Sequence, residues 1–155
     1  MTSASPASGT PLFTRIDHVG IAVPNLDEAI AYYEASFGLS VTARETNEAQ
    51  GVHEAMLAVQ LHGAPVFGGS FVQLLEPTRD DSPVGKFLAK KGPGIHHIAY
   101  GVADVSGALD QLGAKGLQLI DLHPRHGAMN SSIAFVHPKS VGGVLTELVQ
   151  AASPA

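Results

Sequence analysis

The feature of this sequence that most constrains its fold is an internal repeat. Residues 16–23, IDHVGIAV, return 79 positions later as residues 95–102, IHHIAYGV, so that His18 corresponds to His97. In both copies a helix N-cap residue follows, Asn25 or Asp104, and then an amphipathic stretch and a glycine. A period this long that occurs only twice indicates a duplicated module, because solenoid proteins repeat short units many times.

Each copy reads as a strand, a helix and three further strands. Short apolar runs predict strands at 14–23, 39–45, 52–59, 71–76, 95–102, 117–120, 132–136 and 143–149. Helical periodicity predicts helices at 26–37, 82–91 and 105–112, with loops at 61–69 and 121–130. We therefore expect an α+β fold: two tandem β-α-β-β-β modules that form a curved eight-stranded mixed sheet around a central site, with the helices outside.

Length and composition bound the domain organisation. The chain has 155 residues, of which 45% are hydrophobic, and this is enough to build a core without staples. We expect a flexible N-terminal tail at 1–13 and a single domain at 14–150. That domain divides into module one at 14–76, a linker at 77–94 and module two at 95–150.

Composition also bounds the partners and the compartment. The chain contains no cysteine, so it has neither disulfides nor thiolate metal ligands, and we expect a cytoplasmic protein. A net charge of -5 argues against nucleic acid as a partner, because phosphate binding needs clustered Lys and Arg. No apolar run approaches the length of a membrane span, so we expect no membrane partner.

Five polar side chains fall on strand faces that are otherwise apolar or small. Side chains alternate between the two faces of a strand, so His18 is expected to share a face with Ile16, and His97 with Ile95. The same alternation places Gln73, Glu147 and Glu54 among apolar residues. One such residue is usually a core group satisfied by the backbone, but two of these five are carboxylates, which are costly to bury unpaired.

Four of these residues form a set suited to a metal ion. The first and last strands of each module supply one ligand apiece: His18 and Gln73 in module one, His97 and Glu147 in module two. Two imidazoles, an amide oxygen and a carboxylate suit a divalent cation, with cobalt favoured and manganese, nickel, zinc or iron as alternatives. Glu54 is then left as a candidate general base.

The neighbouring histidine, His96, aligns with Asp17 in the repeat. Alternation therefore assigns His96 to the opposite strand face, and His97 is chosen as the ligand. His53, His62, His123, His126 and His137 are expected in exposed or structural positions, and Glu45 and Glu76 are expected to be surface residues at strand ends.

The sequence resembles the vicinal oxygen chelate (VOC), or glyoxalase-type, superfamily, and within it the methylmalonyl-CoA epimerase family. The resemblance spans about residues 16–149 and depends on six segments: IDHVGIAV at 16–23, QGVHEAM at 50–56, VQLLEP at 72–77, GIHHIA at 94–99, HPKS at 137–140 and GVLTEL at 143–148. A histidine strand alone would fit any member of the superfamily. Gln73 combined with Glu54 is more specific.

The resemblance implies a function and the residues that carry it. It implies metal ligands at His18, Gln73, His97 and Glu147, and an acid–base pair formed by Glu54 and Glu147. The expected reaction is metal-dependent epimerisation of methylmalonyl-CoA at C2, interconverting the (R) and (S) forms by 1,1-proton transfer through a metal-stabilised enolate. The expected partners are methylmalonyl-CoA or a similar acyl-CoA and a second copy of the chain in a homodimer.

Several alternatives remain open from the sequence. A glyoxalase-type lyase would prefer a carboxylate in place of Gln73, and an extradiol dioxygenase would hold iron with two His and one Glu, which leaves Gln73 surplus. An epimerase of a different acyl-CoA would share the same ligands. A metal-free VOC binding protein would not need the four ligands together, so bound metal separates that class from the enzymes.

Overall fold

The computed structural model describes residues 11–59 and 70–153. Residues 1–10 of the expected tail, and the whole of the expected loop at 61–69 with His62, lie outside these ranges. The elements in chain order are β1 (Arg15–Ala22), α1 (Leu26–Phe37), β2 (Ser40–Asn47), β3 (Val52–Ala58), β4 (Phe71–Pro77), α2 (Pro83–Lys91), β5 (Gly94–Gly101), α3 (Val105–Ala114), β6 (Arg125–His126), η1 (Ala128–Asn130), β7 (Ser132–Val136), η2 (Pro138–Ser140) and β8 (Thr146–Gln150).

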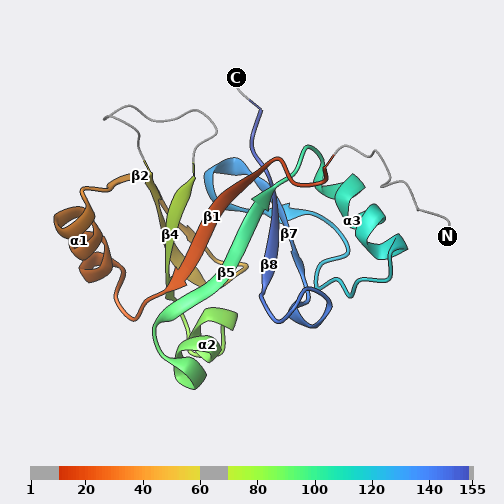
Figure 1. The fold of residues 1–155 in the computed structure, drawn as a ribbon. Coiled ribbons are helices and arrows are strands. Elements are labelled where there is room, and N and C mark those ends of the chain that lie inside the picture. The colour runs from red at the N-terminus through yellow and green to blue at the C-terminus, as the bar shows by residue number, and fades with distance from the viewer. Residues whose placement is uncertain (1–10, 60–69, 154–155) are drawn as a thin grey trace, which may run out of the picture.

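The strands form one curved, mixed sheet of eight strands in the order β2-β3-β4-β1-β5-β8-β7-β6 (Figure 1). The first strands of the two modules, β1 and β5, pair antiparallel at the centre. Each of them pairs in parallel with the last strand of its own module, β1 with β4 and β5 with β8. The two halves therefore have the same strand order outward from the centre, which confirms the α+β fold predicted from the repeat.

Two of the helices cover the outer face of the sheet at opposite ends (Figure 1). The Asn25 and Asp104 side chains cap α1 and α3 by accepting hydrogen bonds from Glu28 N and Gly107 N, as the sequence predicted. Apolar side chains of α1, including Ile30, pack on β3 and β4, and those of α3, including Leu109, pack on β7 and β8. This burial anchors both ends of the sheet.

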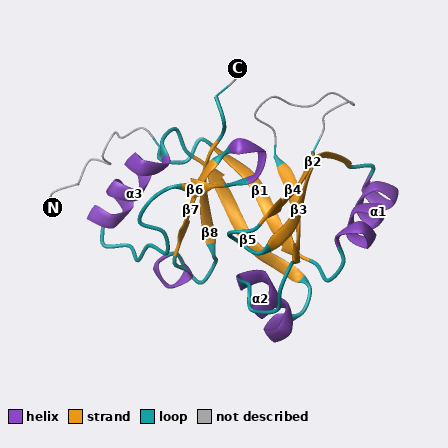
Figure 2. Ribbon diagram, turned by 180° about the vertical axis from the view of Figure 1, so that it is seen from behind, coloured by secondary structure: helices purple, strands orange, loops and turns teal. Residues whose placement is uncertain are grey.

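The remaining helix, α2, lies at the lower end of the central strands (Figure 2). Its Val84 packs in one cluster with Ala22 of β1, Val52 of β3 and Leu75 of β4. Side chains at these positions project from the inner face, so α2 differs from α1 and α3 by closing one end of the hollow side. No helix in the described ranges is long and apolar enough to cross a membrane.

The predicted strand at 117–120 is wrong. The sixth strand of the chain is instead β6, which lies within the segment 121–130 that was expected to be a loop. Leu119 makes only an isolated bridge with Val136. Two residues later the Asp121 carboxylate accepts the Phe135 backbone N–H at 2.8 Å, so a side chain takes the donor that a further strand residue would use. The last strand begins at Thr146 rather than at 143, because Gly142 and Gly143 form a turn with φ of 78° and 94°.

Two β-bulges change which side chains face inward. Ile16 lies opposite Tyr100 and His18 opposite Ala99, so Asp17 is an extra residue in β1; in β5 the extra residue is His96. Residues directly opposite one another share a face, so Ile16 lies on the outer face with Tyr100 and is 55% exposed. The expectation that Ile16 shares the face of His18, and Ile95 that of His97, is therefore wrong.

A glycine in β1 makes room for one of these inward side chains. Gly20 lies directly opposite His97, and a Cβ built on Gly20 would lie 2.2–2.6 Å from atoms of the His97 ring. Since the clash involves a buried ring, the ring would have to move. Gly20→Ala should lower the free energy of unfolding in urea by about 1–3 kcal/mol. Gly94→Ala is the matched control: a Cβ there meets nothing within 4 Å, so a change of under about 0.5 kcal/mol is expected. Equal effects of the two substitutions would contradict the close approach.

Candidate metal centre

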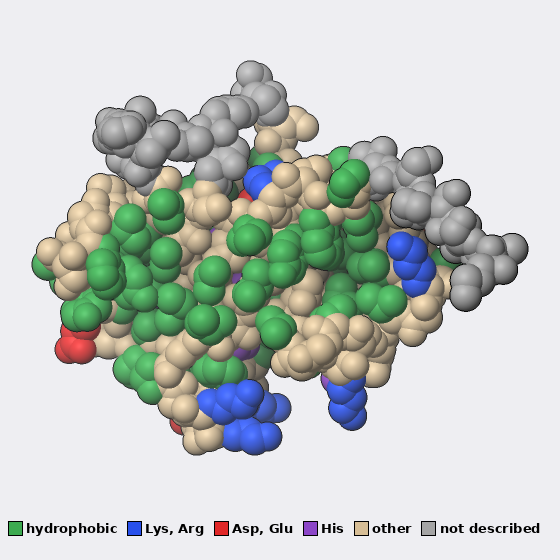
Figure 3. Space-filling model, in the orientation of Figure 1, with side chains coloured by type: hydrophobic (Ala, Val, Ile, Leu, Met, Phe, Trp, Pro, Cys, Tyr) green, Lys and Arg blue, Asp and Glu red, His purple; other side chains and the backbone are tan. Residues whose placement is uncertain are grey.

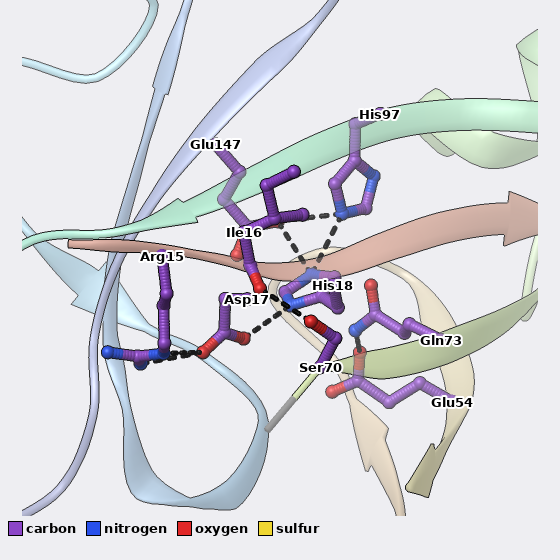
Figure 4. A network of polar contacts seen from close by, with 9 residues as sticks. All are labelled: Arg15, Ile16, Asp17, His18, Glu54, Ser70, Gln73, His97 and Glu147. Carbon is purple, nitrogen blue, oxygen red and sulfur yellow. Dashed lines mark hydrogen bonds and ion pairs between the residues drawn. The ribbon is translucent and has the colours of Figure 1, made fainter. Parts of the chain in front are cut away.

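Three ionisable side chains meet at the middle of the inner face (Figure 4). They are His18 of β1, His97 of β5 and Glu147 of β8, and each is at most 4% exposed. The two Nε2 atoms lie 3.2 Å apart. Glu147 Oε2 lies 2.8 Å from the Nε2 of His97 and 3.5 Å from that of His18. His18 and His97 are 79 positions apart in the sequence, and His97 and Glu147 are 50 apart, yet the fold brings their donor atoms to one point.

These distances fit a single bound cation. Ligand atoms about 2.1 Å from one ion and at right angles to each other lie about 3 Å apart. The three donor atoms lie within 4.8 Å of one another, and the shorter contacts bracket the spacing that one ion requires. Imidazole and carboxylate together suit a borderline divalent metal.

Gln73 of β4 can supply a fourth donor. Its Nε2 donates a hydrogen bond of 2.8 Å to Glu54 Oε2, which fixes the orientation of the amide. Its Oε1 is buried and has no hydrogen-bond partner within the described part of the chain. Gln73 and His97 both lie opposite Gly20, on either side of β1, and Figure 4 shows the amide oxygen on the side of His18 and His97. A buried acceptor without a partner is costly, so a cation here would satisfy Gln73.

The identity of residue 73 matters because it links the ligand set to Glu54. An amide can donate to the Glu54 carboxylate and still present an oxygen to an ion. A glutamate at this position would place two carboxylates in contact, and they could not both ionise. Gln73 therefore fits a site that keeps a separate carboxylate beside the metal.

Glu54 of β3 is that separate carboxylate. It is 2% exposed, and its Oε1 also lacks a hydrogen-bond partner among the described residues. Burial, together with the charges of Glu45 and Glu147, raises the pKa of Glu54 to about 8. Glu45, expected to be a surface residue, lies directly opposite Glu54 on β2 and accepts a hydrogen bond from the Met129 backbone. A raised pKa beside a metal site is typical of an acid–base residue.

Glu147 has the opposite electrostatic environment. Burial alone would raise its pKa, but the charges and hydrogen bonds of His97 and His18 outweigh this and hold the pKa at about 2. Burial would lower the pKa of His18, but Asp17 and Glu147 raise it to about 9. Without an ion, His18 is therefore an imidazolium that pairs with two carboxylates. A cation could replace that proton.

Asp17 is a residue of the candidate site that the sequence interpretation missed. Its Oδ2 lies 2.7 Å from His18 Nδ1, and Arg15 binds its Oδ1 through both Nε and a terminal nitrogen. Burial would raise the pKa of Asp17, but the hydrogen bonds from His18 and Arg15 lower it below its usual range. The carboxylate thus orients His18 so that Nε2 faces the centre.

His96 is the corresponding residue in module two, and the expectation that it faces away is wrong. The β5 bulge brings its Nδ1 to 2.9 Å from His97 Nδ1. Burial, with a smaller effect of the His97 charge, lowers the pKa of His96 to about 4. The sequence held a signal for both missed residues, since each copy of the repeat places a polar side chain directly before its ligand histidine.

Other polar residues have structural roles. The Glu76 carboxylate accepts a hydrogen bond from Leu26 N at the start of α1, and His137 accepts one from Lys139 N in its turn. His53 contacts Thr46 on an exposed part of the sheet. His123, just before β6, and His126, within β6, are both exposed. None of these contacts involves the metal ligands.

Comparison with known proteins relates this geometry to a family. The family model described as Glyoxalase/Bleomycin resistance protein/Dioxygenase superfamily matches residues 17–135. A solved structure of Streptomyces coelicolor methylmalonyl-CoA epimerase, a variant in complex with 2-nitronate-propionyl-CoA, is 50% identical, has a TM-score of 0.85, and aligns over 91% of this chain and 99% of that chain.

Curated relatives agree with the structural match. Methylmalonyl-CoA epimerase of Dictyostelium discoideum is 37% identical over 136 residues, which cover 86% of this chain and 76% of the relative. Ethylmalonyl-CoA/methylmalonyl-CoA epimerase of Cereibacter sphaeroides is 35% identical over 138 residues, which cover 88% and 97%. The chain therefore belongs to the methylmalonyl-CoA epimerase family within the glyoxalase superfamily.

Proposed function

We propose that this protein is a methylmalonyl-CoA epimerase that interconverts the (R) and (S) forms of its substrate at C2. The observation that carries the proposal is a buried carboxylate oxygen without a partner, Glu54 Oε1, beside a convergent set of metal-binding atoms. The relatives named as epimerases, and the acyl-CoA analogue bound by the Streptomyces coelicolor enzyme, support the substrate class. The lack of cysteine supports a cytoplasmic location.

The metal ligands in this proposal are His18, Gln73, His97 and Glu147, with cobalt favoured as the ion. The fit of the donor spacing and the unpaired Gln73 oxygen support this set. When bound, the ion would supply a Lewis acid that polarises the thioester carbonyl and makes the C2 proton more acidic. The residues around it exclude water, since all four ligand side chains are buried.

Glu54 and Glu147 move the proton on opposite faces of the substrate. Glu54 comes from β3 and Glu147 from β8, and three strands lie between them, so the two carboxylates approach the centre from opposite sides. In the metal-free protein, their pKa values of about 8 and about 2 keep Glu54 protonated and Glu147 ionised at neutral pH. A two-base epimerisation starts from this pair of states: one group removes a proton and the other returns one.

The glyoxalase-type reading is less well supported. It requires a metal-binding carboxylate where Gln73 stands, and a carboxylate could not donate the hydrogen bond that Glu54 receives here. An epimerase that also accepts a larger acyl group remains the second candidate, because the Cereibacter sphaeroides relative is named for both ethylmalonyl-CoA and methylmalonyl-CoA.

We also propose that the protein is a homodimer formed through the outer face of β1 and β5. Between α1 and α3 this face is apolar and uncovered, as Figure 3 shows in the view of Figure 1. It carries Phe13, stacked on Tyr100, together with Ile16 and Ile95, which are 55% and 61% exposed. A continuous apolar sheet face is expected to be covered by a partner, and a second copy would present the same apolar surface.

The first prediction from this proposed function concerns Glu54. Glu54→Gln should reduce epimerisation by about 10²- to 10⁴-fold, because the amide can neither deliver a proton to C2 nor take one up, but can still accept the Gln73 hydrogen bond. Proton NMR of methylmalonyl-CoA in deuterium oxide measures the loss of the C2 signal, and metal analysis should find unchanged ion content. Glu34→Gln, at an exposed position of α1, is the matched control. Exchange at the parental rate in Glu54→Gln would remove Glu54 from the mechanism.

The second prediction concerns pH and metal binding. A ligand imidazole must lose its proton, and the pKa of about 9 means that His18 carries one at pH 7 in the metal-free protein. Metal affinity should therefore rise with pH, by about tenfold per unit below that pKa. Calorimetry in two buffers of different ionisation enthalpy counts the protons released at pH 7. Release of at least one proton per ion is expected. The same release is expected in Glu54→Gln, which lacks Glu54, the second group whose pKa is raised. Binding with no proton release would contradict the assignment of His18.

The third prediction concerns the dimer. Ile16→Glu and Ile95→Glu each place a charge on the outer face, so they should shift the mass from that of a dimer to about the 16.0 kDa of one chain. Light scattering after size exclusion measures this mass. Leu122→Glu, at a 71% exposed apolar residue in the loop before β6, should leave it unchanged. A parent protein that is already monomeric would overturn the proposal.

A further inference from the structure

We infer that His96 is a positioning residue: its imidazole accepts a hydrogen bond from His97 Nδ1–H and thereby holds His97 Nε2 toward the metal. The inference rests on the proposed metal site. It goes beyond that site because His96 is neither a proposed ligand nor a member of the proposed acid–base pair. In module one the Asp17 carboxylate accepts the hydrogen bond from His18 Nδ1 and orients that ring. The two halves of the duplicated fold therefore orient their ligand histidines with chemically different partners.

The first step is that equivalent bulges create the two pairs. In β1 the extra residue is Asp17 and in β5 it is His96, and each directly precedes a ligand histidine. An extra residue bends the strand locally, so neighbouring side chains that would alternate come to lie together. The resulting contacts are alike in length: 2.7 Å from Asp17 Oδ2 to His18 Nδ1, and 2.9 Å between the Nδ1 atoms of His96 and His97.

The second step fixes the tautomers. His97 Nε2 faces His18 Nε2 and Glu147 Oε2, so Nε2 is the atom of His97 that could bind an ion. A neutral imidazole that ligates through Nε2 carries its proton on Nδ1. The His96 Nδ1 facing it must then be an acceptor, with the His96 proton on Nε2. One pair of tautomers satisfies both the ion and the hydrogen bond.

The third step concerns how the His96 ring is held. It packs edge to face on Phe87 of α2, with ring centroids 5.2 Å apart, and at 5.2 Å on His97. His97 in turn lies over Gly20 and against Phe135, at 5.5 Å. Packing on both sides leaves the two rings little freedom to rotate, so α2 supports the metal site through Phe87 and His96.

The difference between the two partners has a chemical consequence. Asp17 brings a negative charge to His18, and Arg15 balances it. The His96 imidazole, unlike a carboxylate, brings no negative charge to His97. It therefore orients the ligand without adding negative charge to the ligand set, and the ion keeps more of its positive charge for an anionic substrate.

Cobalt affinity, measured by competition with a chelator, tests this inference. His96→Phe keeps a ring against Phe87 but removes the acceptor, so it should weaken cobalt binding about 10- to 100-fold. His96→Asn keeps an acceptor oxygen near the place of Nδ1 and should restore affinity to within about threefold of the parent. His53→Phe, which removes a histidine that contacts no ligand, is the matched control and should bind as the parent does. Urea unfolding of each metal-free variant checks that the fold is retained.

The outcomes separate this inference from the proposed metal site. If His96→Phe binds cobalt as tightly as the parent, or His96→Asn binds as weakly as His96→Phe, the acceptor role is overturned while the metal site stands. If the parent itself binds no cobalt, both fail. A second readout is nitrogen NMR of the zinc-loaded protein, which should show His96 protonated on Nε2. Protonation of His96 on Nδ1 would contradict the inference.

Discussion

The structure depends on the burial of two histidines, a glutamate and a glutamine around one point in the middle of a sheet. Groups of this kind are costly to remove from water unless their charges and hydrogen-bonding atoms are satisfied. Here His18 and His97 contact Glu147, while the inward oxygen of Gln73 has no partner within the described ranges. A single cation would satisfy the remaining donor atoms, so the unusual burial and the proposed chemistry have the same physical cause.

Duplication supplies the site with symmetry, and differences between the halves supply its chemistry. The last strand of each module contributes one of the proposed oxygen ligands, an amide from Gln73 and a carboxylate from Glu147. In β3, Glu54 lies two residues before Met56, which pairs with Gln73. In β7, Ile133 lies two residues before Phe135, which pairs with Glu147, so Ile133 is the counterpart of Glu54. The free carboxylate therefore exists on one side only. Such a departure from symmetry is what an acid–base pair with separated pKa values requires.

The repeat was sufficient to predict the two modules and their curved mixed sheet, the two outer helices and the five inward polar residues, because strand alternation and helix caps are local patterns. It failed where local pattern and tertiary structure differ. The bulges interrupt the alternation of side chains along β1 and β5, so Asp17 and His96, the polar residues directly before the two central histidines, were assigned to the wrong face. The apolar run at 117–120 resembled a strand, but the Asp121 side chain occupies the Phe135 N–H that further pairing would need. Glu45 looked like a surface residue because its closeness to Glu54 follows only from strand pairing.

The central claim is that four side chains from four strands hold one ion. A crystal structure of the cobalt-loaded protein, with anomalous data collected at the cobalt edge, tests it most directly. The account predicts one cobalt per chain, about 2.0–2.2 Å from the Nε2 atoms of His18 and His97 and from oxygens of Gln73 and Glu147. A cobalt bound elsewhere, or a Gln73 amide oxygen turned away from the ion, would contradict it.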